Sequence, residues 1–269
     1  MKGKRRIRVL VSGACGRMGR EVVRAVAAEK DMAVAGGVDV AGEGRDVGEQ
    51  AGAGRLGVPV TSDLKEALSA AAPDVVVDFT TAAGFEGRAM EILRRNCRLV
   101  AGTTGIPEPA LEKIRKTSER RGLGVIVAPN FAVGAVLMMN FARQAARFLP
   151  DVEIVELHHD RKADAPSGTA LYTAGLVNGA LRGAPGAKDP TKTLKLKGCR
   201  GGRAGRVTVH SVRLPGFLAH QEVIFGGPGQ TLTIRHDTTS REAFMPGVLF
   251  AVRAVVKLDR FVYGLENLM

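Results

Sequence analysis

Tryptophan is absent from this chain of 269 residues, and tyrosine and cysteine occur only twice and three times. The cysteines, Cys15, Cys97 and Cys199, are odd in number and have no paired spacing. This argues against both a disulfide framework and a zinc site. The chain also lacks an apolar run of the roughly 18 residues that span a bilayer. We therefore expect a protein of the reducing cytoplasm that has no membrane partner.

Acidic residues are the minority charge, with 27 Asp and Glu against 39 Lys and Arg and a net charge of +12. Such an excess makes nucleic acid a possible partner. The basic residues are spread along the chain, however, and are not interleaved with aromatic residues as in a single-strand groove. We expect instead a surface that attracts anionic small molecules, and no binding of nucleic acid.

The first half of the chain alternates apolar runs with helical patterns. A basic start at residues 1–6 and the apolar run 7–11 resemble the beginning of a signal peptide. The apolar run is short and continues into a glycine loop, so a first strand is expected instead. Strands are predicted at 7–11, 33–38, 75–79, 98–101 and 124–127, and helices at 17–28, 64–71, 83–94 and 110–121. This alternation is typical of an α/β fold with a doubly wound parallel sheet.

The pattern changes from about residue 132. Helices are predicted at 133–148, near 171–181 and at 241–257, and strands at 152–157, 207–214, 220–225 and 231–236. The glycine-rich segment 226–230 is typical of a hairpin turn between the last two strands. The second half is therefore expected to form an α+β domain on a mostly antiparallel sheet, inserted before a terminal helix.

A glycine loop follows the first predicted strand and opens the first helix. Gly13, Gly16 and Gly19 would allow a tight turn, a close approach of backbone N–H groups to a pyrophosphate, and close packing of helix on strand. Their G-x-x-G-x-x-G spacing departs from the commoner G-x-G-x-x-G, and an ordinary glycine-rich turn remains the alternative. The cofactor-binding residues expected here are Gly13, Ala14, Cys15, Gly16, Arg17 and Met18.

Asp39 ends the second predicted strand, about twenty residues beyond the loop. Its carboxylate would accept hydrogen bonds from the adenosine ribose and so favour NADH, unless it is only a solvated strand-end acid. Val40 follows where an arginine could bind a 2′-phosphate, although Arg17 and Arg45 could still do so. The expected cofactor is therefore NADH or NADPH.

Two later loops also follow predicted parallel strands. Their small and hydroxylated residues suit contact with the nicotinamide and its ribose, although each taken singly is more often just a turn. The residues concerned are Gly102, Thr103 and Thr104 in the first loop, and Ala128, Pro129, Asn130 and Phe131 in the second.

A short segment of the second half gathers cationic side chains beside a helix start. His158 and His159 end a predicted strand, and Lys162 follows. Ser167 is a plausible N-cap, which would leave the N–H groups of Gly168 and Thr169 facing an anion such as a carboxylate or phosphate. A metal site is the main competitor, but adjacent strand residues point to opposite faces and no third ligand is evident. A purely structural role is the other alternative.

The run Glu156-Leu157-His158-His159-x-x-Lys162-x-Asp164-Ala165-Pro166-Ser167-Gly168-Thr169-Ala170 closely resembles the signature of the 4-hydroxy-tetrahydrodipicolinate reductases of lysine and diaminopimelate biosynthesis. The likeness extends to the segments 13–19, 102–105, 128–131, 210–216 and 225–247. It implies a homotetrameric oxidoreductase that takes hydride from NADH or NADPH. It also implies a dinucleotide-binding domain at 1–131, completed by 240–269, and a substrate-binding and oligomerisation domain at 132–239.

The resemblance also assigns roles to residues. His158 would be a proton donor and acceptor, and Lys162 a proton donor. The substrate-binding residues would be His159, Ser167, Gly168, Thr169 and Thr104. The implied substrate is a cyclic imine with two carboxylates, so hydride addition would push electron density onto nitrogen. A protonated His or Lys nearby would stabilise that charge, a role worth about 10²–10⁴-fold in rate.

Two other functions stay open at this stage. A homoserine or aspartate type of dehydrogenase would share the glycine loop and Asp39, but would not need the segment from His158 to Thr169. A non-enzymatic nucleotide-binding regulator, or a basic nucleic-acid binder, would show no turnover with the cyclic substrate.

Overall fold

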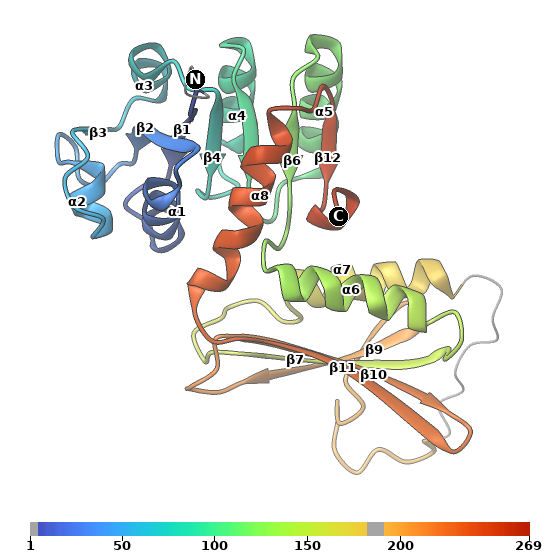
Figure 1. The fold of residues 1–269 in the computed structure, drawn as a ribbon. Helices are drawn as coiled ribbons and strands as arrows, with labels where there is room; N and C mark the ends of the chain where they lie inside the picture. Colours follow the sequence, from blue (N-terminus) through green and yellow to red (C-terminus); the bar gives the residue numbers. More distant parts are fainter. Residues whose placement is uncertain (1–4, 182–190) are drawn as a thin grey trace. The chain divides into compact units, whose positions relative to one another are not determined.

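The computed structural model describes residues 5–181 and 191–269. Two compact units divide the chain: one comprises the residues up to Phe131 together with Phe244–Met269, and the other comprises Ala132–Ala243 (Figure 1). Each unit contains its own sheet. Within the described residues, no helix has the length and apolarity to cross a membrane.

The first unit is built on a seven-stranded sheet in the order β12-β6-β5-β4-β1-β2-β3, with every neighbouring pair parallel. The strand bounds are β1 Ile7–Ser12, β2 Met32–Val38, β3 Val60–Thr61, β4 Val75–Asp78, β5 Arg98–Ala101, β6 Val125–Val127 and β12 Phe261–Tyr263. The strand order reverses at β1, which pairs with both β2 and β4. Ligands of doubly wound sheets bind at this reversal, beyond the carboxyl ends of the strands.

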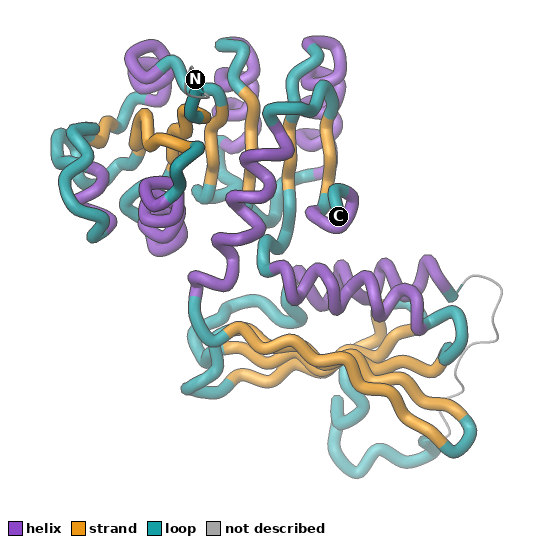
Figure 2. Tube along the Cα trace, in the orientation of Figure 1, coloured by secondary structure: helices purple, strands orange, loops and turns teal. Residues whose placement is uncertain are grey.

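Helices cover both faces of this sheet, so its central strands are apolar on both sides (Figure 2). The helices are α1 Arg17–Ala28, α2 Val47–Ala51, α3 Leu64–Ala71, α4 Phe85–Arg94, α5 Glu108–Arg121 and α8 Met245–Val255. Helices α3, α4 and α5 pack in a row and share one core cluster with alternate strand residues such as Leu10 and Val76. Helices α1 and α8 pack against each other, and α8 also contacts β4, β5 and β6.

The second unit has a five-stranded sheet in the order β11-β10-β7-β9-β8. Its strands are β7 Asp151–His158, β8 Gly202–Ala204, β9 Val207–Arg213, β10 Ala219–Gly227 and β11 Gln230–Thr238. Among these strands of the described ranges, β7 and β9 pair in parallel and the other neighbours pair antiparallel. Helices α6 Val133–Ala145 and α7 Gly168–Ala180 pack together over one face of the sheet (Figure 1).

The predicted fold class is confirmed, since a doubly wound parallel sheet is joined to a mostly antiparallel one. The hairpin also forms as expected, with Gly229 in a left-handed conformation at φ 68°. The predicted terminal helix is instead a 3₁₀ turn, Arg241–Phe244, followed by α8. The elements α2, β3, β8 and β12 were not predicted, because segments of two to five residues are too short to show a periodicity.

Candidate functional site

The glycine loop after β1 can only be built with glycine at its two ends. Gly13 has φ +80°, a conformation that residues with a Cβ rarely adopt. A Cβ on Gly19 would lie 1.9 Å from the carbonyl oxygen of Gly13, so the first turn of α1 packs directly on the loop. The start of α1 therefore presents backbone N–H groups at the strand-order reversal, as a pyrophosphate cradle requires.

Asp39 connects the end of β2 to this loop. Its Oδ2 accepts a hydrogen bond from the backbone N–H of Cys15 at 2.8 Å, and its Oδ1 accepts one from Ala41 at 3.0 Å. Asp39 is thus more than a solvated strand-end acid, because it holds the loop in place. Val40 beside it is 94% exposed. Both residues line a cavity of about 560 Å³ that also contains Gly13 and Gly16.

The same cavity is also lined by residues that the sequence pattern did not predict as part of a site. These are Ser12, Val38, Ser62, Leu64, Phe79, Thr80, Thr81 and Arg88. The loop after β4 could have been found, because the carboxyl ends of parallel strands share one edge of a sheet. At its base lies the fully buried Asp78, which accepts hydrogen bonds from the hydroxyls of Thr80 at 2.7 Å and Thr103 at 2.9 Å.

Phe79 brings the later cofactor candidates together. A Cβ on Gly102 would lie 2.1 Å from the Phe79 ring, so this ring packs against the backbone of the loop after β5. The rings of Phe79 and Phe131 are 5.7 Å apart between centroids, which connects the loop after β6. The loops after β5 and β6 therefore both contact Phe79, through Gly102 and Phe131. Neither loop contributes a residue to the lining of the 560 Å³ cavity.

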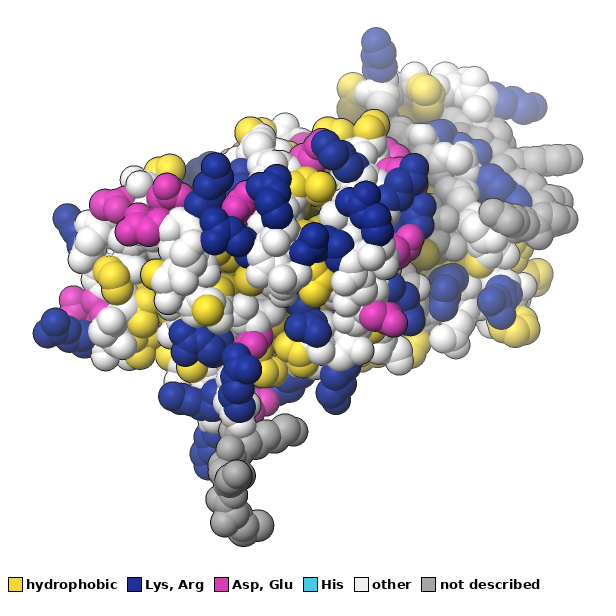
Figure 3. All heavy atoms as spheres, turned by 90° about the horizontal axis from the view of Figure 1, so that it is seen from above, with side chains coloured by type: hydrophobic (Ala, Val, Ile, Leu, Met, Phe, Trp, Pro, Cys, Tyr) yellow, Lys and Arg dark blue, Asp and Glu magenta, His cyan; other side chains and the backbone are white. Residues whose placement is uncertain are grey.

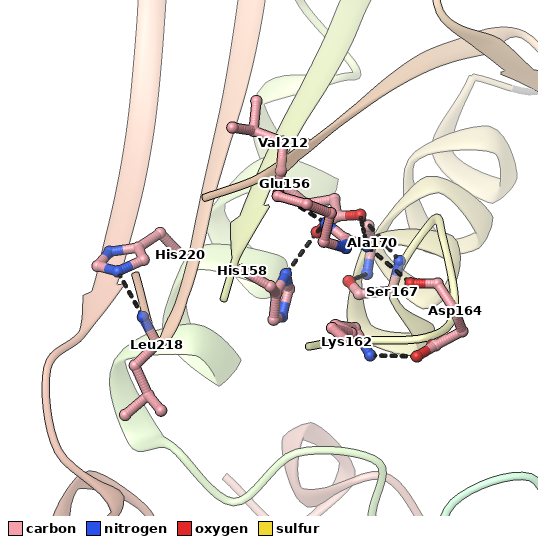
Figure 4. A network of polar contacts seen from close by, with 10 residues as sticks. Glu156, His158, Lys162, Asp164, Ser167, Ala170, Val212, Leu218 and His220 are labelled. Carbon is pink, nitrogen blue, oxygen red and sulfur yellow. Dashed lines mark hydrogen bonds and ion pairs between the residues drawn. The ribbon is translucent and has the colours of Figure 1, made fainter. Parts of the chain in front are cut away.

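In the second unit, a buried carboxylate orders the end of β7 (Figure 4). Glu156 is fully buried, and its Oε2 lies 2.5 Å from Nδ1 of His158. Arg213 on β9 donates to both carboxylate oxygens, at 2.7 and 2.9 Å. Burial raises the pKa of Glu156, but the hydrogen bonds from His158 and Arg213 outweigh it and lower the pKa to about 2. The group is therefore a stable carboxylate at neutral pH.

Lys162 lies in the loop after β7 and is largely shielded. Its Nζ pairs with Oδ1 of Asp164 at 2.6 Å, and this ion pair lowers the pKa of Asp164. Arg213 donates to the backbone carbonyl of Asp164 at 2.8 Å, so the same guanidinium that holds Glu156 also holds this loop.

The start of α7 has the expected capped form. The hydroxyl of Ser167 accepts the N–H of Ala170 at 3.1 Å, which confirms Ser167 as the N-cap. The N–H of Ser167 itself donates to Glu156 at 3.2 Å. Gly168 and Thr169 are the first two helical residues, so their N–H groups point out of the helix start. A Cβ on Gly168 would meet nothing within 4 Å, which leaves open space beside the capped end.

The predicted site residues therefore fall into two groups. Those at residues 13–18, 39, 102–104 and 128–131 belong to the first unit, and this group includes Thr104, which was expected to bind substrate. His158, His159, Lys162, Ser167, Gly168 and Thr169 belong to the second unit. In the described ranges, no group of three or more His, Cys, Asp or Glu side chains is placed to hold a metal ion.

Comparison with known proteins matches both units to one family. Residues 7–131 match the family model described as "Dihydrodipicolinate reductase, N-terminus", and residues 134–269 match "Dihydrodipicolinate reductase, C-terminus". The 4-hydroxy-tetrahydrodipicolinate reductase of Moorella thermoacetica is 51% identical over 263 residues, covering 98% of each chain. That of Syntrophomonas wolfei is 45% identical over 266 residues, covering 99% of this chain and all of the relative.

A solved structure gives the same result. A dihydrodipicolinate reductase from Paenisporosarcina sp. TG-14, bound to dipicolinate, superposes with a TM-score of 0.85 at 42% identity and covers 98% of this chain and 100% of its own. GenD2 of gentamicin biosynthesis, solved with NAD, shares only the fold, at 18% identity and a TM-score of 0.63. The chain belongs to the 4-hydroxy-tetrahydrodipicolinate reductase family, whose members are oxidoreductases that use NADH or NADPH.

Proposed function

We propose that this chain reduces 4-hydroxy-tetrahydrodipicolinate to tetrahydrodipicolinate with a hydride from NADH or NADPH. The observation that carries the proposal is the cluster at the end of β7. One short segment there combines three features: a histidine that a buried carboxylate holds, a shielded lysine, and the capped start of a helix. Family membership and the dipicolinate-bound relative support this choice of substrate.

In this proposal, the first unit holds the dinucleotide and the second unit holds the substrate. The residues around Gly13 fit a dinucleotide. Gly19 has no Cβ, so the start of α1 packs closely on the loop, and Asp39 lines the adjoining cavity. Asp39 would accept the ribose hydroxyls while it holds the loop through Cys15. The candidates around Phe79 would contact the nicotinamide end. Bound NADH or NADPH would supply the hydride.

The second unit would bind and protonate. The N–H groups of Gly168 and Thr169, with Ser167, would hold one substrate carboxylate at the start of α7, where the helix dipole favours an anion. His159 and Thr104 would add further substrate contacts. His158 and Lys162 would stabilise the electron density that hydride addition moves onto the ring nitrogen, and would supply a proton.

The net charge of +12 favours approach of both ligands, because the dinucleotide and the dicarboxylate are anions. On the face drawn in Figure 3, Lys and Arg side chains are spread over the surface with Asp and Glu among them. This distribution fits long-range attraction of small anions better than a single continuous binding track.

A homotetramer and a cytoplasmic location complete the proposal. The face of the five-stranded sheet away from α6 and α7 carries the half-buried apolar side chains Val155, Leu157, Val212 and Ile224. Burial of such a face against further copies would stabilise an assembly, which light scattering would measure as about four times the chain mass. A monomeric mass would contradict the tetramer. Cys15, Cys97 and Cys199 are free thiols, in keeping with a reducing compartment that cell fractionation would test.

The decisive experiment is a coupled assay in which a synthase generates the cyclic substrate and the absorbance of reduced nicotinamide is followed. Oxidation that depends on both substrate and enzyme is expected. No oxidation with either NADH or NADPH would contradict the proposed function, and turnover of homoserine or aspartate would favour another dehydrogenase.

A further inference from the structure

The Glu156 carboxylate is more than a structural ion-pair partner for Arg213. Each of its oxygens receives a donor from the guanidinium, and Oε1 also receives the N–H of Ser167 at 3.2 Å. Oε2 also lies 2.5 Å from Nδ1 of His158, so one further acceptor position of this oxygen is occupied by the ring. The carboxylate therefore connects the proposed acid to the start of the helix that would bind the substrate.

This contact determines which nitrogen of His158 keeps its hydrogen when the ring is neutral. A carboxylate only accepts hydrogen bonds, so the neighbouring Nδ1 must be the donor. The remaining nitrogen, Nε2, has no hydrogen-bond partner among the residues that the structure describes. The hydrogen bond at one ring nitrogen thus leaves the other for chemistry, as in other carboxylate–histidine pairs.

We propose that Glu156 is a positioning residue, which holds His158 in the Nδ1–H tautomer so that Nε2 exchanges the proton with the substrate. The substrate in this inference rests on the proposed function, whereas the tautomer of His158 rests on its hydrogen bond to Glu156. In the transfer, the ring starts doubly protonated, the Nε2–H bond breaks, its electron pair stays on Nε2, and the proton moves to the electron-rich substrate. The neutral ring then takes up H⁺ from the solvent at Nε2, which supplies the proton that the reduction consumes, while Nδ1–H stays bonded to Glu156.

The surrounding charges suit such a cycle. Arg213 neutralises the buried carboxylate whether His158 is charged or neutral, so loss of the Nε2 proton does not leave Glu156 without a cation. Glu156 and His158 are two residues apart on β7 and so project from the same face of the strand. His159 lies beyond the end of β7, which distinguishes the two adjacent histidines physically.

The first test measures the tautomer in the unmodified protein. Two-bond ¹H–¹⁵N correlations of the histidine rings, with His158 assigned by its loss in His158→Gln, report which nitrogen is protonated when the ring is neutral. The Nδ1–H pattern is expected. An Nε2–H pattern would overturn the proposal, and because this measurement needs no substitution at Glu156, it decides even where such a variant fails to fold.

The second test is a double-mutant cycle on turnover, with Glu156→Gln, His158→Gln and the double variant, each checked for folding by circular dichroism. Glu156→Gln is expected to lower kcat about tenfold to hundredfold with little change in KM for the cofactor. In the His158→Gln background the same substitution should have almost no further effect on kcat, because Glu156 acts through His158. An equal loss in both backgrounds would show a merely structural role and overturn the proposal.

The chain offers a matched control on the same strand. Oε2 of Glu153 lies 2.7 Å from Nε2 of His210, and its Oε1 accepts a hydrogen bond from Nη2 of Arg200 at 2.6 Å. Glu153, like Glu156, therefore has one histidine and one arginine as partners. Glu153→Gln should leave kcat within about twofold, and a loss equal to that of Glu156→Gln would count against a specific role for Glu156. Absence of turnover in the unmodified protein would instead contradict the proposed function, while the tautomer measurement would still stand.

Discussion

At the scale of single residues, the proposed chemistry depends on which side chains already have protein partners. Among the described residues, His158 is hydrogen-bonded through one nitrogen only, and Lys162 is held by an exposed carboxylate, Asp164, that a substrate carboxylate could replace. Asp39 is bonded by two backbone N–H groups and still lines the cavity of the first unit. These three side chains are therefore held in position before any ligand binds.

Substitution of His158 tests the assignment of the acid. His158→Gln should lower kcat about 10²–10⁴-fold, since general acid catalysis contributes rate factors of that size. Binding of NADH, followed by its fluorescence, should change little, because His158 belongs to the second unit. Intact turnover with a strong loss of NADH binding would contradict the assignment.

Substitution of Asp39 tests cofactor recognition. Asp39→Ala should weaken the binding of NADH about tenfold or more, because a charged acceptor for the ribose hydroxyls is lost. The loss should be smaller for NADPH, whose 2′-phosphate is repelled by this carboxylate. Steady-state KM values for both cofactors would measure the difference. Asp39 also holds Cys15, so an equal loss for both cofactors would reduce its role to that structural one.

At the scale of elements, two capped helix starts have the same local chemistry but different surroundings. Ser167 caps α7 at the proposed carboxylate site, and Asp63 caps α3 by accepting the N–H groups of Lys65 and Glu66. In both helices the side-chain oxygen satisfies a backbone donor that has no acceptor in the helix. The start of α7 lies beside the candidate catalytic residues, whereas the start of α3 lies beside the cavity of the first unit that contains Gly13 and Asp39.

Substitutions of the two capping residues are expected to have the same effect on stability but different effects on substrate binding. Ser167→Ala and Asp63→Ala should each lower the free energy of unfolding by about 1 kcal/mol, measured by urea denaturation. At saturating cofactor, only Ser167→Ala should also raise the substrate KM, because the N–H groups of Gly168 and Thr169 lose their fixed direction. An equal rise of KM in Asp63→Ala would show that the effect is global.

At the scale of the whole molecule, the buried carboxylate contributes to stability in a pH-dependent way. The pKa of Glu156 is lowered from its ordinary value of 4.5 to about 2, because the hydrogen bonds from His158 and Arg213 outweigh burial. A carboxylate with a lowered pKa stabilises the folded state fully above its unfolded pKa. It loses that contribution as the pH falls toward the folded value.

We therefore expect the unfolding free energy to fall between about pH 5 and pH 2, in part through Glu156. The Glu156→Gln variant should be less stable at neutral pH, and its deficit should shrink as the pH falls through this range. Urea denaturation of both proteins at a series of pH values would measure this. A deficit that stays constant from pH 7 to pH 3 would contradict the linkage.

Much of this protein follows from its sequence alone. Apolar runs in alternation with helical periods determined the parallel sheet, and the glycines of the loop after β1 specified a turn that other residues cannot adopt. The segment from Glu156 to Ala170 identified the family, which the comparisons confirmed. These features are local, because burial, backbone conformation and capping depend on residues close together in the chain.

The tertiary structure decided what depends on residues far apart. Arg213 bonds to Glu156 over a separation of 57 positions in the chain, and Thr103 bonds to Asp78 over 25. No local sequence pattern predicts either pair. The parallel pairing of β7 with β9 and the packing of Phe79 on Gly102 arise in the same way. A sequence pattern shows that a side chain will be buried, but only the folded chain shows which partner it meets and which nitrogen of His158 remains for chemistry.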